Sequence, residues 1–196
     1  MKKGFLVFLV IVGVLAVIGM AFMGTYNDLI VRDEVVNQAW AQVENVYQRR
    51  LDLIPNLVET VKGYAAHEKS TLEAITEARS HAGGTISSDV FNDPQKFKAF
   101  QESQGALSSA LSRLLVVSEN YPNLKADQNF IALQAQLEGT ENRISVERGR
   151  FNEAAQSFNA RFRSFPANVI GGRFGFKVKE YFKSEAGANK VPQVMF

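Results

Sequence analysis

The sequence contains no cysteine, and this absence removes several classes of protein at once. Disulfide frameworks, thiol catalysis and cysteine-ligated zinc or iron–sulfur centres all require a thiol. Proline is sparse, with five residues in 196, and histidine occurs only twice. The formal net charge is +2, so the strongly basic balance typical of nucleic-acid-binding proteins is missing. We therefore expect no nucleic-acid partner.

One long uncharged segment lies near the N-terminus. Residues 4–24, GFLVFLVIVGVLAVIGMAFMG, would span about 31 Å as a helix, close to the ~30 Å hydrocarbon core of a bilayer. Two lysines precede it and few basic residues follow it, which favours a cytoplasmic N-terminus and an external remainder. A cleaved signal peptide with Gly19-Met20-Ala21 as its site is the alternative, but the apolar run is longer than usual. We predict a short cytoplasmic N-terminus and a single uncleaved anchor over 1–24.

The rest of the chain has the pattern of an all-α protein. Four apolar stripes with spacings of three and four residues indicate amphipathic helices, while no useful length alternates as a strand would. Loop-forming residues occupy 81–94 and 120–127. Asp93 is expected to cap the helix that follows it, and the last helix is expected to begin near Asp127. The predicted helical bundle covers 25–165, with Trp40 and the phenylalanines at 151, 158, 162 and 165 in its core.

A predicted helix bend falls at Asp52 and Pro55. Proline cannot donate a backbone hydrogen bond and clashes with the preceding turn, so it bends a helix or lies in its first turn. If Asp52 caps a new helix near Leu53, the domain is an antiparallel up-and-down four-helix bundle whose last helix returns to the membrane. If one kinked helix runs through Pro55, the alternative is a three-helix bundle with a membrane-distal tail.

Metal binding by the two histidines is the first chemical hypothesis to consider. His67-Glu68 lacks the second histidine of the two-turn zinc motif, and adjacent helical side chains point about 100° apart. Glu77 and His81 share one face, but they would need a third ligand. We expect no metal and no cofactor.

Catalysis by paired carboxylates is the second hypothesis. Asp33-Glu34 are adjacent, and Asp52 and Glu59 are seven residues apart on one helical face. Such carboxylates are typical of a solvated face, and nothing in the sequence indicates a raised pKa. We expect no catalytic residues; the alternative is a metal-dependent enzyme or sensor that uses His67 and nearby carboxylates.

The tail, residues 166–196, is the predicted contact site for lipid headgroups or a partner protein. It mixes basic and aromatic residues, a composition found where proteins meet membrane surfaces. The competing interpretation is a strap packed along the bundle, because residues 24–142 hold 16 acidic and 10 basic side chains. The candidate contact residues are Arg173, Phe174, Phe176, Lys177, Lys179, Tyr181, Phe182 and Lys183.

A series of short motifs extends over residues 24–196. They are Tyr26-Asn27, Trp40, Arg49-Arg50, DLIPNLV from Asp52, GYAAHE from Gly63, Ala78-Arg79, Phe151-Asn152, Phe165-Pro166 and the terminal VPQVMF ending at Phe196. Together these motifs resemble the LemA family. The resemblance implies a bacterial inner-membrane protein with an external antiparallel four-helix bundle, and it favours Pro55 as the start of a second helix. It supplies no catalytic residues.

These observations predict a non-enzymatic, membrane-anchored helical interaction or scaffold protein of the bacterial cell envelope. Its expected partners are the lipid bilayer, further copies of itself as a homo-oligomer, and an unidentified envelope protein. The glycines of the anchor are not in G-x-x-x-G spacing, so self-association is expected outside the bilayer.

Overall fold

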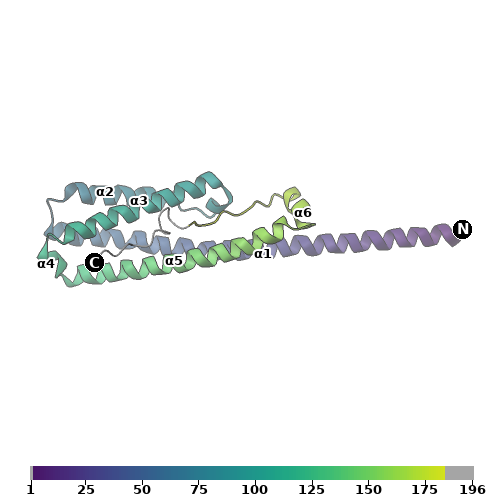
Figure 1. The fold of residues 1–196 in the computed structure, drawn as a ribbon, viewed down its shortest axis with the longest axis horizontal. Coiled ribbons are helices and arrows are strands. Elements are labelled where there is room, and N and C mark those ends of the chain that lie inside the picture. Colours follow the sequence, from purple (N-terminus) through teal and green to yellow (C-terminus); the bar gives the residue numbers. More distant parts are fainter. Residues whose placement is uncertain (1, 184–196) are drawn as a thin grey trace, which may run out of the picture.

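The computed structural model describes residues 2–183, and every regular element in this range is helical. The main elements are long helices that run side by side along one axis (Figure 1). In chain order the elements are α1 (Lys2–Tyr64), α2 (Lys69–Gly84), the 3-10 turn η1 (Val90–Asn92), α3 (Pro94–Ser118), α4 (Pro122–Lys125), α5 (Gln128–Arg163) and α6 (Ala167–Arg173). The expected all-α architecture with an apolar N-terminal helix is confirmed.

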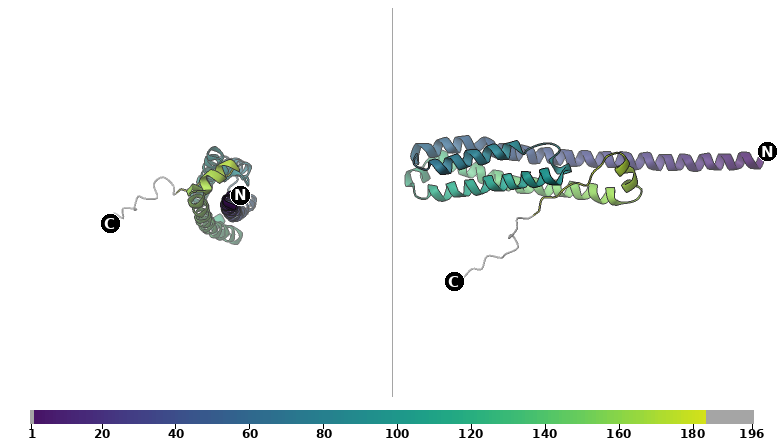
Figure 2. Two further views of the ribbon diagram at one scale, coloured as in Figure 1. Left: turned by 90° about the vertical axis from the view of Figure 1, so that its right-hand side faces the viewer. Right: turned by 90° about the horizontal axis from the view of Figure 1, so that it is seen from above.

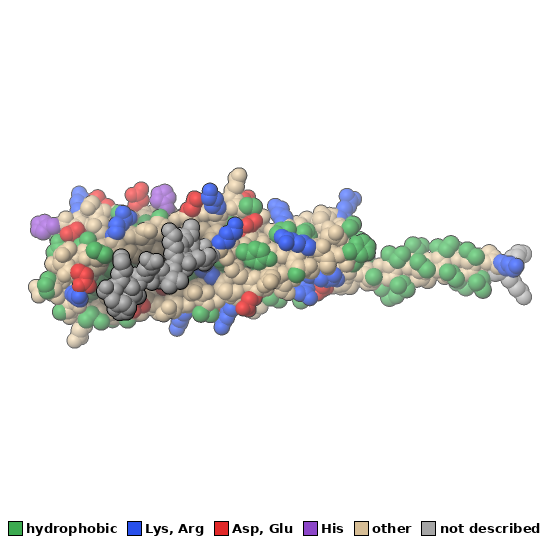
Figure 3. All heavy atoms as spheres, in the orientation of Figure 1, with side chains coloured by type: hydrophobic (Ala, Val, Ile, Leu, Met, Phe, Trp, Pro, Cys, Tyr) green, Lys and Arg blue, Asp and Glu red, His purple; other side chains and the backbone are tan. Residues whose placement is uncertain are grey.

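Helix α1 is 63 residues long and joins the apolar segment to the bundle without a break. Its first part projects alone from the bundle, and the large apolar side chains from Phe5 to Met23 are all exposed (Figures 1 and 3). Among the described helices, α1 is the one long and apolar enough to cross a membrane. An apolar surface of this extent, left open by the chain itself, indicates a membrane protein.

Pro55 lies inside α1, which continues to Tyr64. Of the two alternatives for Pro55, a second helix that begins near Leu53, which the family resemblance favoured, is therefore wrong, and one helix runs through the proline. Asp52 does not cap a helix; its carboxylate accepts a hydrogen bond of 2.8 Å from Gln48 Nε2, one turn earlier. The chain instead leaves α1 after Tyr64 and resumes as α2 at Lys69. A continuous first helix therefore does not place the tail far from the membrane. The chain still reverses direction, but it does so after Tyr64 rather than near Leu53.

Helix α5 runs antiparallel to α1 and returns to the end of the bundle where the apolar segment leaves. Tyr64 near the far end of α1 contacts Asp127 just before α5, whereas Asp28 near the apolar segment contacts Arg161 in the last turn of α5. Helices α2 and α3 pack on each other, and α2 also packs on α1 (Figures 1 and 2). The sequence that follows α5 is thus carried back toward the apolar segment.

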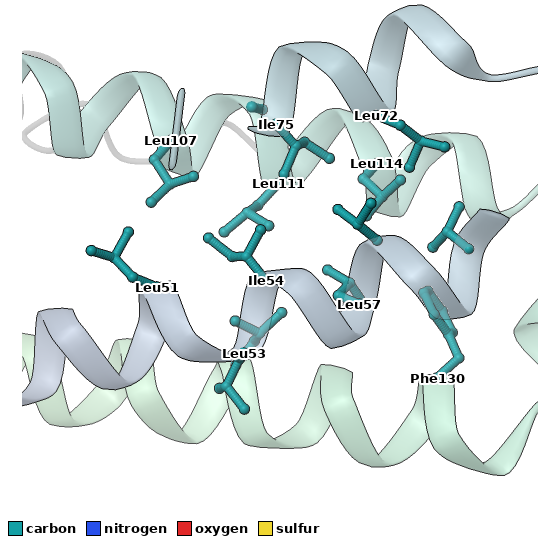
Figure 4. Packing of buried hydrophobic residues seen from close by; sticks show 14 of the residues in the cluster. Leu51, Leu53, Ile54, Leu57, Leu72, Ile75, Leu107, Leu111, Leu114 and Phe130 are labelled. Carbon is teal, nitrogen blue, oxygen red and sulfur yellow. The ribbon is translucent and has the colours of Figure 1, made fainter. Parts of the chain in front are cut away.

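Two buried clusters hold these helices together. The cluster farther from the apolar segment is mainly aliphatic. It places Leu51, Ile54 and Leu57 of α1 against side chains from α2 and α3, while Leu53 points toward α5 (Figure 4). The cluster nearer the apolar segment contains Trp40 and the phenylalanine rings packed around it. We call these rings the aromatic cluster: Trp40, Phe91, Phe97, Phe100, Phe151 and Phe182. Each cluster removes large apolar side chains from water, at roughly 1.5–3 kcal/mol per buried side chain.

The predicted helix starts at Asp93 and Asp127 are confirmed. Asp93 accepts hydrogen bonds from the backbone of Gln95 and Lys96, and Asp127 accepts one from Phe130. These bonds satisfy donors that have no partner inside the helix.

The segment after α5 differs from expectation. Phe151 and Phe158 are fully buried, but Phe165 is 81% exposed, so its assignment to the core is wrong. The cause is local: α5 ends at Arg163, two residues before Phe165, and the chain turns there into the short helix α6. Pro166 and the glycines at 171–172 predicted only the end of a helix, and α6 was missed.

Candidate functional site

Residues 174–183 form an extended segment, here called the strap, that leaves α6 and runs back along the bundle (Figures 1 and 2). It contains seven of the eight predicted contact residues, and Arg173 immediately precedes it. The strap lies against α5 and η1, and Glu180 donates its backbone N–H to the carbonyl of Phe91. The candidate site is therefore this strap together with the residues of α5 and η1 that hold it.

Two asparagines on α5 bind the strap by its backbone. Asn159 donates to the carbonyl of Lys179 at 2.9 Å and accepts from the same residue's N–H at 2.8 Å. Asn152, two helical turns earlier, makes the same pair of bonds with Phe182, both at 2.9 Å. Each amide side chain offers both a donor and an acceptor. It therefore makes the pair of backbone hydrogen bonds that a neighbouring β-strand would otherwise make with the strap. For residues 179–182 the structure thus shows the competing interpretation of the tail, a strap packed along the bundle.

Lys179 is inside the protein rather than at its surface. Its side chain is 4% exposed, and its ammonium lies 2.5 Å from Asp33 Oδ1 and 2.7 Å from Asn92 Oδ1. The rings of Phe91 and Phe158 flank the same ammonium at 5.2 and 4.8 Å. A buried cation needs such partners, because burying an unpaired charge is costly. Lys179 therefore fastens the strap to α1 and η1.

The aromatic residues of the strap divide into buried and exposed members. Phe182 is buried in the aromatic cluster, 5.0 Å from Phe97 between ring centroids. Tyr181 is half-buried, and its hydroxyl contacts Asn159 Nδ2 at 2.8 Å. Phe176 is half-buried against Tyr26 and Phe158.

The exposed members gather at the two ends of the strap. Arg173, Phe174 and Lys177 are exposed where the strap leaves α6, and Lys183 is exposed at the other end. The predicted contact residues are therefore brought together along one path, but only these four offer surface to a partner. Residues 184–196, which complete the predicted tail, lie outside the described residues.

A small polar cavity of about 180 Å³ lies where the described strap ends. Arg50 in its wall is only 2% exposed, and its Nη1 donates to Glu141 at 2.8 Å and to Ser108 at 3.1 Å. Its Nη2 donates to Gln104. Arg148 at the rim donates to the carbonyl of Lys183. These contacts join α1, α3, α5 and the strap, which accounts for a buried arginine in a helical bundle.

The candidate metal and catalytic residues do not come together. Glu68 accepts a hydrogen bond from the hydroxyl of Tyr121, and Glu59 pairs with Lys62. His81 and Glu77 are neighbours at 3.9 Å, both largely exposed. Within residues 2–183, no three histidine, aspartate or glutamate side chains form a group able to hold a metal ion. Asp33, one of the two adjacent carboxylates Asp33-Glu34, forms the ion pair with Lys179.

A second charged network closes the bundle at the end nearest the apolar segment. Arg161 Nε donates to Asp28 at 2.6 Å, and Arg32 donates to the other oxygen of the same carboxylate at 3.0 Å. The hydrogen bond from Arg161, supported by Arg32, lowers the pKa of Asp28 below its ordinary value. Arg32 also reaches Ser157 on α5 at 2.7 Å. This network fixes the end of α5 beside the first turns of α1 that follow the apolar segment.

Comparison with known proteins decides the family. Residues 39–196 match the LemA family, which is most of the chain and includes the strap. The chain belongs to the LemA family. The resemblance noted from the sequence motifs is thereby confirmed.

The relatives of this chain include magnetosome proteins and a protein named LemA. Magnetosome protein MamQ 2 of Paramagnetospirillum magneticum is 28% identical over 198 residues, covering 90% of this chain and 72% of the relative. Magnetosome protein MamQ of Magnetospirillum gryphiswaldense is 27% identical, covering 86% and 70%. Protein LemA of Metamycoplasma hominis is 24% identical over 149 residues, covering 76% and 64%.

Sequence reasoning missed the asparagines that make the site. Asn152 was noted only as part of a family motif, and Asn159 was not singled out. Their spacing of seven places both on the buried face of α5, where a polar amide needs a partner. Two asparagines at this spacing within an apolar stripe are a signal that could have identified the strap's binding surface.

Proposed function

We propose that this LemA-family protein is a non-enzymatic scaffold of the bacterial cell envelope, anchored in the inner membrane by residues 4–24 of α1. The anchor and the bundle share one continuous helix, so the bundle is joined to the membrane by a helix rather than by a flexible linker. Lys2 and Lys3 favour a cytoplasmic N-terminus, with the bundle on the outer side. The relatives named as magnetosome proteins support a membrane-associated role.

The observation that carries the scaffold role is an apolar stripe on α1 immediately outside the anchor. Ile30, Val31 and Val35, the α1 stripe, are 43%, 62% and 49% exposed. The other side of the same turns is occupied, since Leu29 and Val36 are buried in the hydrophobic cluster that also contains Trp40. Contiguous exposed apolar residues of this kind are typical of a protein–protein contact.

A second copy of the same chain is the partner that fits the α1 stripe. Every copy inserted in the same membrane presents this stripe at the same height, about 10–17 Å beyond Gly24 along the helix. Confinement to one plane also raises the effective concentration of copies, so a modest apolar contact suffices. Self-association outside the bilayer agrees with the anchor's lack of a small-residue motif.

Disulfide cross-linking in the membrane tests this function directly. The chain has no cysteine, so Val35→Cys introduces a single thiol. We expect mild oxidation to give covalent dimers of Val35→Cys, because two stripes in contact bring equivalent residues within disulfide reach. Val116→Cys on α3 is the matched control, since Val116 is 69% exposed but lies away from the stripe. Val31→Cys provides a second position in the stripe. Equal cross-linking of Val35→Cys and Val116→Cys, or no cross-linking of either Val35→Cys or Val31→Cys, would show that the stripe is not an interface.

A further inference from the structure

The turn around α6 exposes large apolar side chains that no described element covers. Phe165, Val169 and Phe174 are 81%, 61% and 56% exposed, and we call these three residues the α6 edge. They flank or belong to a helix of seven residues whose other side is buried, since Ala167 and Ile170 are inaccessible. Large apolar side chains that are exposed together, beside a side that is already buried, are typical of a surface that contacts another apolar environment.

The height of the α6 edge along α1 is fixed by contacts on either side of it. The rings of Phe174 and Tyr26 lie 4.8 Å apart between centroids, and Tyr26 is two residues beyond the apolar segment. Arg161 contacts both Asp28 and Thr25, and Phe165 follows it by four residues in the direction of the apolar segment. The α6 edge therefore lies level with the point where α1 emerges from the bilayer.

The close packing of α6 on α1 depends on a glycine. A Cβ at Gly171 would lie 2.6 Å from Phe162 Cε2 and 3.3 Å from Leu29 Cδ1. Only a residue without a side chain lets α6 approach α1 and the end of α5 at this distance. The short helix is thus held tightly against α1, at the end of the bundle from which the apolar segment projects (Figure 2).

Basic side chains border the α6 edge. Arg163, Arg173 and Lys177 are all exposed. Asp28, on the part of α1 that lies beside the end of α5, is already paired with Arg161 and Arg32. Basic and apolar side chains gather where the bundle meets the projecting rod (Figure 3). A combination of apolar side chains and bordering cations is typical of a surface that binds anionic lipids.

We infer that the α6 edge is a second membrane contact, in which Phe165, Val169 and Phe174 enter the headgroup region of an anionic bilayer and Arg163, Arg173 and Lys177 contact lipid phosphates. This contact requires that α1 cross the bilayer, which is part of the proposed function. A single transmembrane helix lets a bundle rotate and tilt. A second contact beside the helix fixes which face of the bundle points along the membrane, and so orients the α1 stripe.

Spin labels on single thiols test the contact in the full-length chain. Val169→Cys and Phe165→Cys are labelled and reconstituted in nanodiscs that contain phosphatidylglycerol and phosphatidylcholine. We expect both labels to be several-fold more accessible to oxygen than to an aqueous nickel chelate, as for a label at Val12 inside the anchor. A label at Val116 is the aqueous control, and an unchanged circular dichroism spectrum shows that each variant is folded.

The outcomes separate the contact from the anchor. Water-like accessibility at 165 and 169, with lipid-like accessibility at 12, would overturn the second contact and leave the anchor intact. Water-like accessibility at 12 as well would overturn both the contact and the membrane-spanning role of α1. Replacing phosphatidylglycerol with phosphatidylcholine alone should reduce the lipid signal at 169 but not at 12. A signal at 169 that ignores lipid charge would overturn the role of the three cations.

Discussion

Arg79 Nε donates a hydrogen bond of 2.8 Å to the backbone carbonyl of Leu51, and Leu51 is four residues before Pro55. In an unbroken helix that carbonyl would accept the N–H of residue 55, which proline does not have. The proline therefore exposes an acceptor in the middle of α1, and an arginine from α2 supplies the missing donor. This relationship explains why Pro55 can lie inside a long helix without ending it.

Replacing Arg79 should destabilise the bundle through this carbonyl. We expect Arg79→Met to lower the free energy of unfolding by about 1–3 kcal/mol, since a buried carbonyl loses its partner. Lys69→Met on the same helix, where the lysine is exposed, should change it by less than about 0.5 kcal/mol. Chemical denaturation in detergent, followed by circular dichroism, measures both.

Restoring a backbone donor at position 55 should compensate. In a Pro55→Ala background the alanine N–H can reach the Leu51 carbonyl, so Arg79→Met should cost markedly less than in the native background. A double-mutant cycle measures this coupling. Strictly additive effects of the two substitutions would show that Arg79 stabilises the fold by some other contact.

The outline of the fold was predictable because it depends on periodic patterns. Apolar stripes, the cap at Asp93 and the helix start near Asp127 identified the helices, and the uncharged run identified the helix that is long and apolar enough to cross a membrane. The role of Pro55 was not predictable, because it depends on Arg79, whose approach is decided by packing. The same holds for Phe165, whose exposure follows from a turn that the stripe of phenylalanines conceals.

The ion pair between Lys179 and Asp33 should contribute strongly to stability. We expect Asp33→Ala to destabilise the protein by about 3 kcal/mol, because it leaves the buried Lys179 ammonium without its carboxylate. The exposed pair Lys69–Glu73 is the control, and Glu73→Ala should have little effect. Thermal unfolding of the detergent-solubilised protein would reveal the difference. Equal effects at the two sites would contradict a buried role for Lys179.

The asparagine pairs should control whether the strap stays bound. We expect Asn159→Ala combined with Asn152→Ala to release the strap, since four hydrogen bonds to its backbone are lost. Trypsin should then cleave after Lys177 and Lys179 many times faster than in the native protein. Asn142→Ala, an exposed position on the same helix, is the control. Unchanged cleavage in the double variant would mean that side-chain burial alone holds the strap.

The site was only partly predictable for a related reason. Composition identified the basic and aromatic tail, and the structure gathers its residues into one strap. Composition does not distinguish a lysine that faces lipid from one that pairs inside the bundle, because both roles favour neighbouring aromatic rings. That distinction depends on Asp33, Asn92 and Asn159, which are remote in sequence from Lys179.

Acid should weaken the contact between α1 and α5 beside the membrane. The pKa of Asp28 is lowered in the folded state, so its contribution to stability is present above about pH 4 and is lost as the pH falls through the folded pKa. We expect Asp28→Asn to flatten the dependence of the melting temperature on pH below about pH 4. The difference between native and variant curves isolates Asp28 from the other carboxylates. A parallel shift of the two curves would contradict this assignment.

The size of the assembly tests the central claim that the protein is a self-associating membrane scaffold. Native mass spectrometry from nanodiscs or mild detergent measures the mass of the intact particle and identifies any co-purifying chain. We predict a discrete complex of two or more copies that separates into monomers when Val31→Glu places a charge in the α1 stripe. A monomer of unchanged mass in both proteins, in every membrane mimetic, would contradict it.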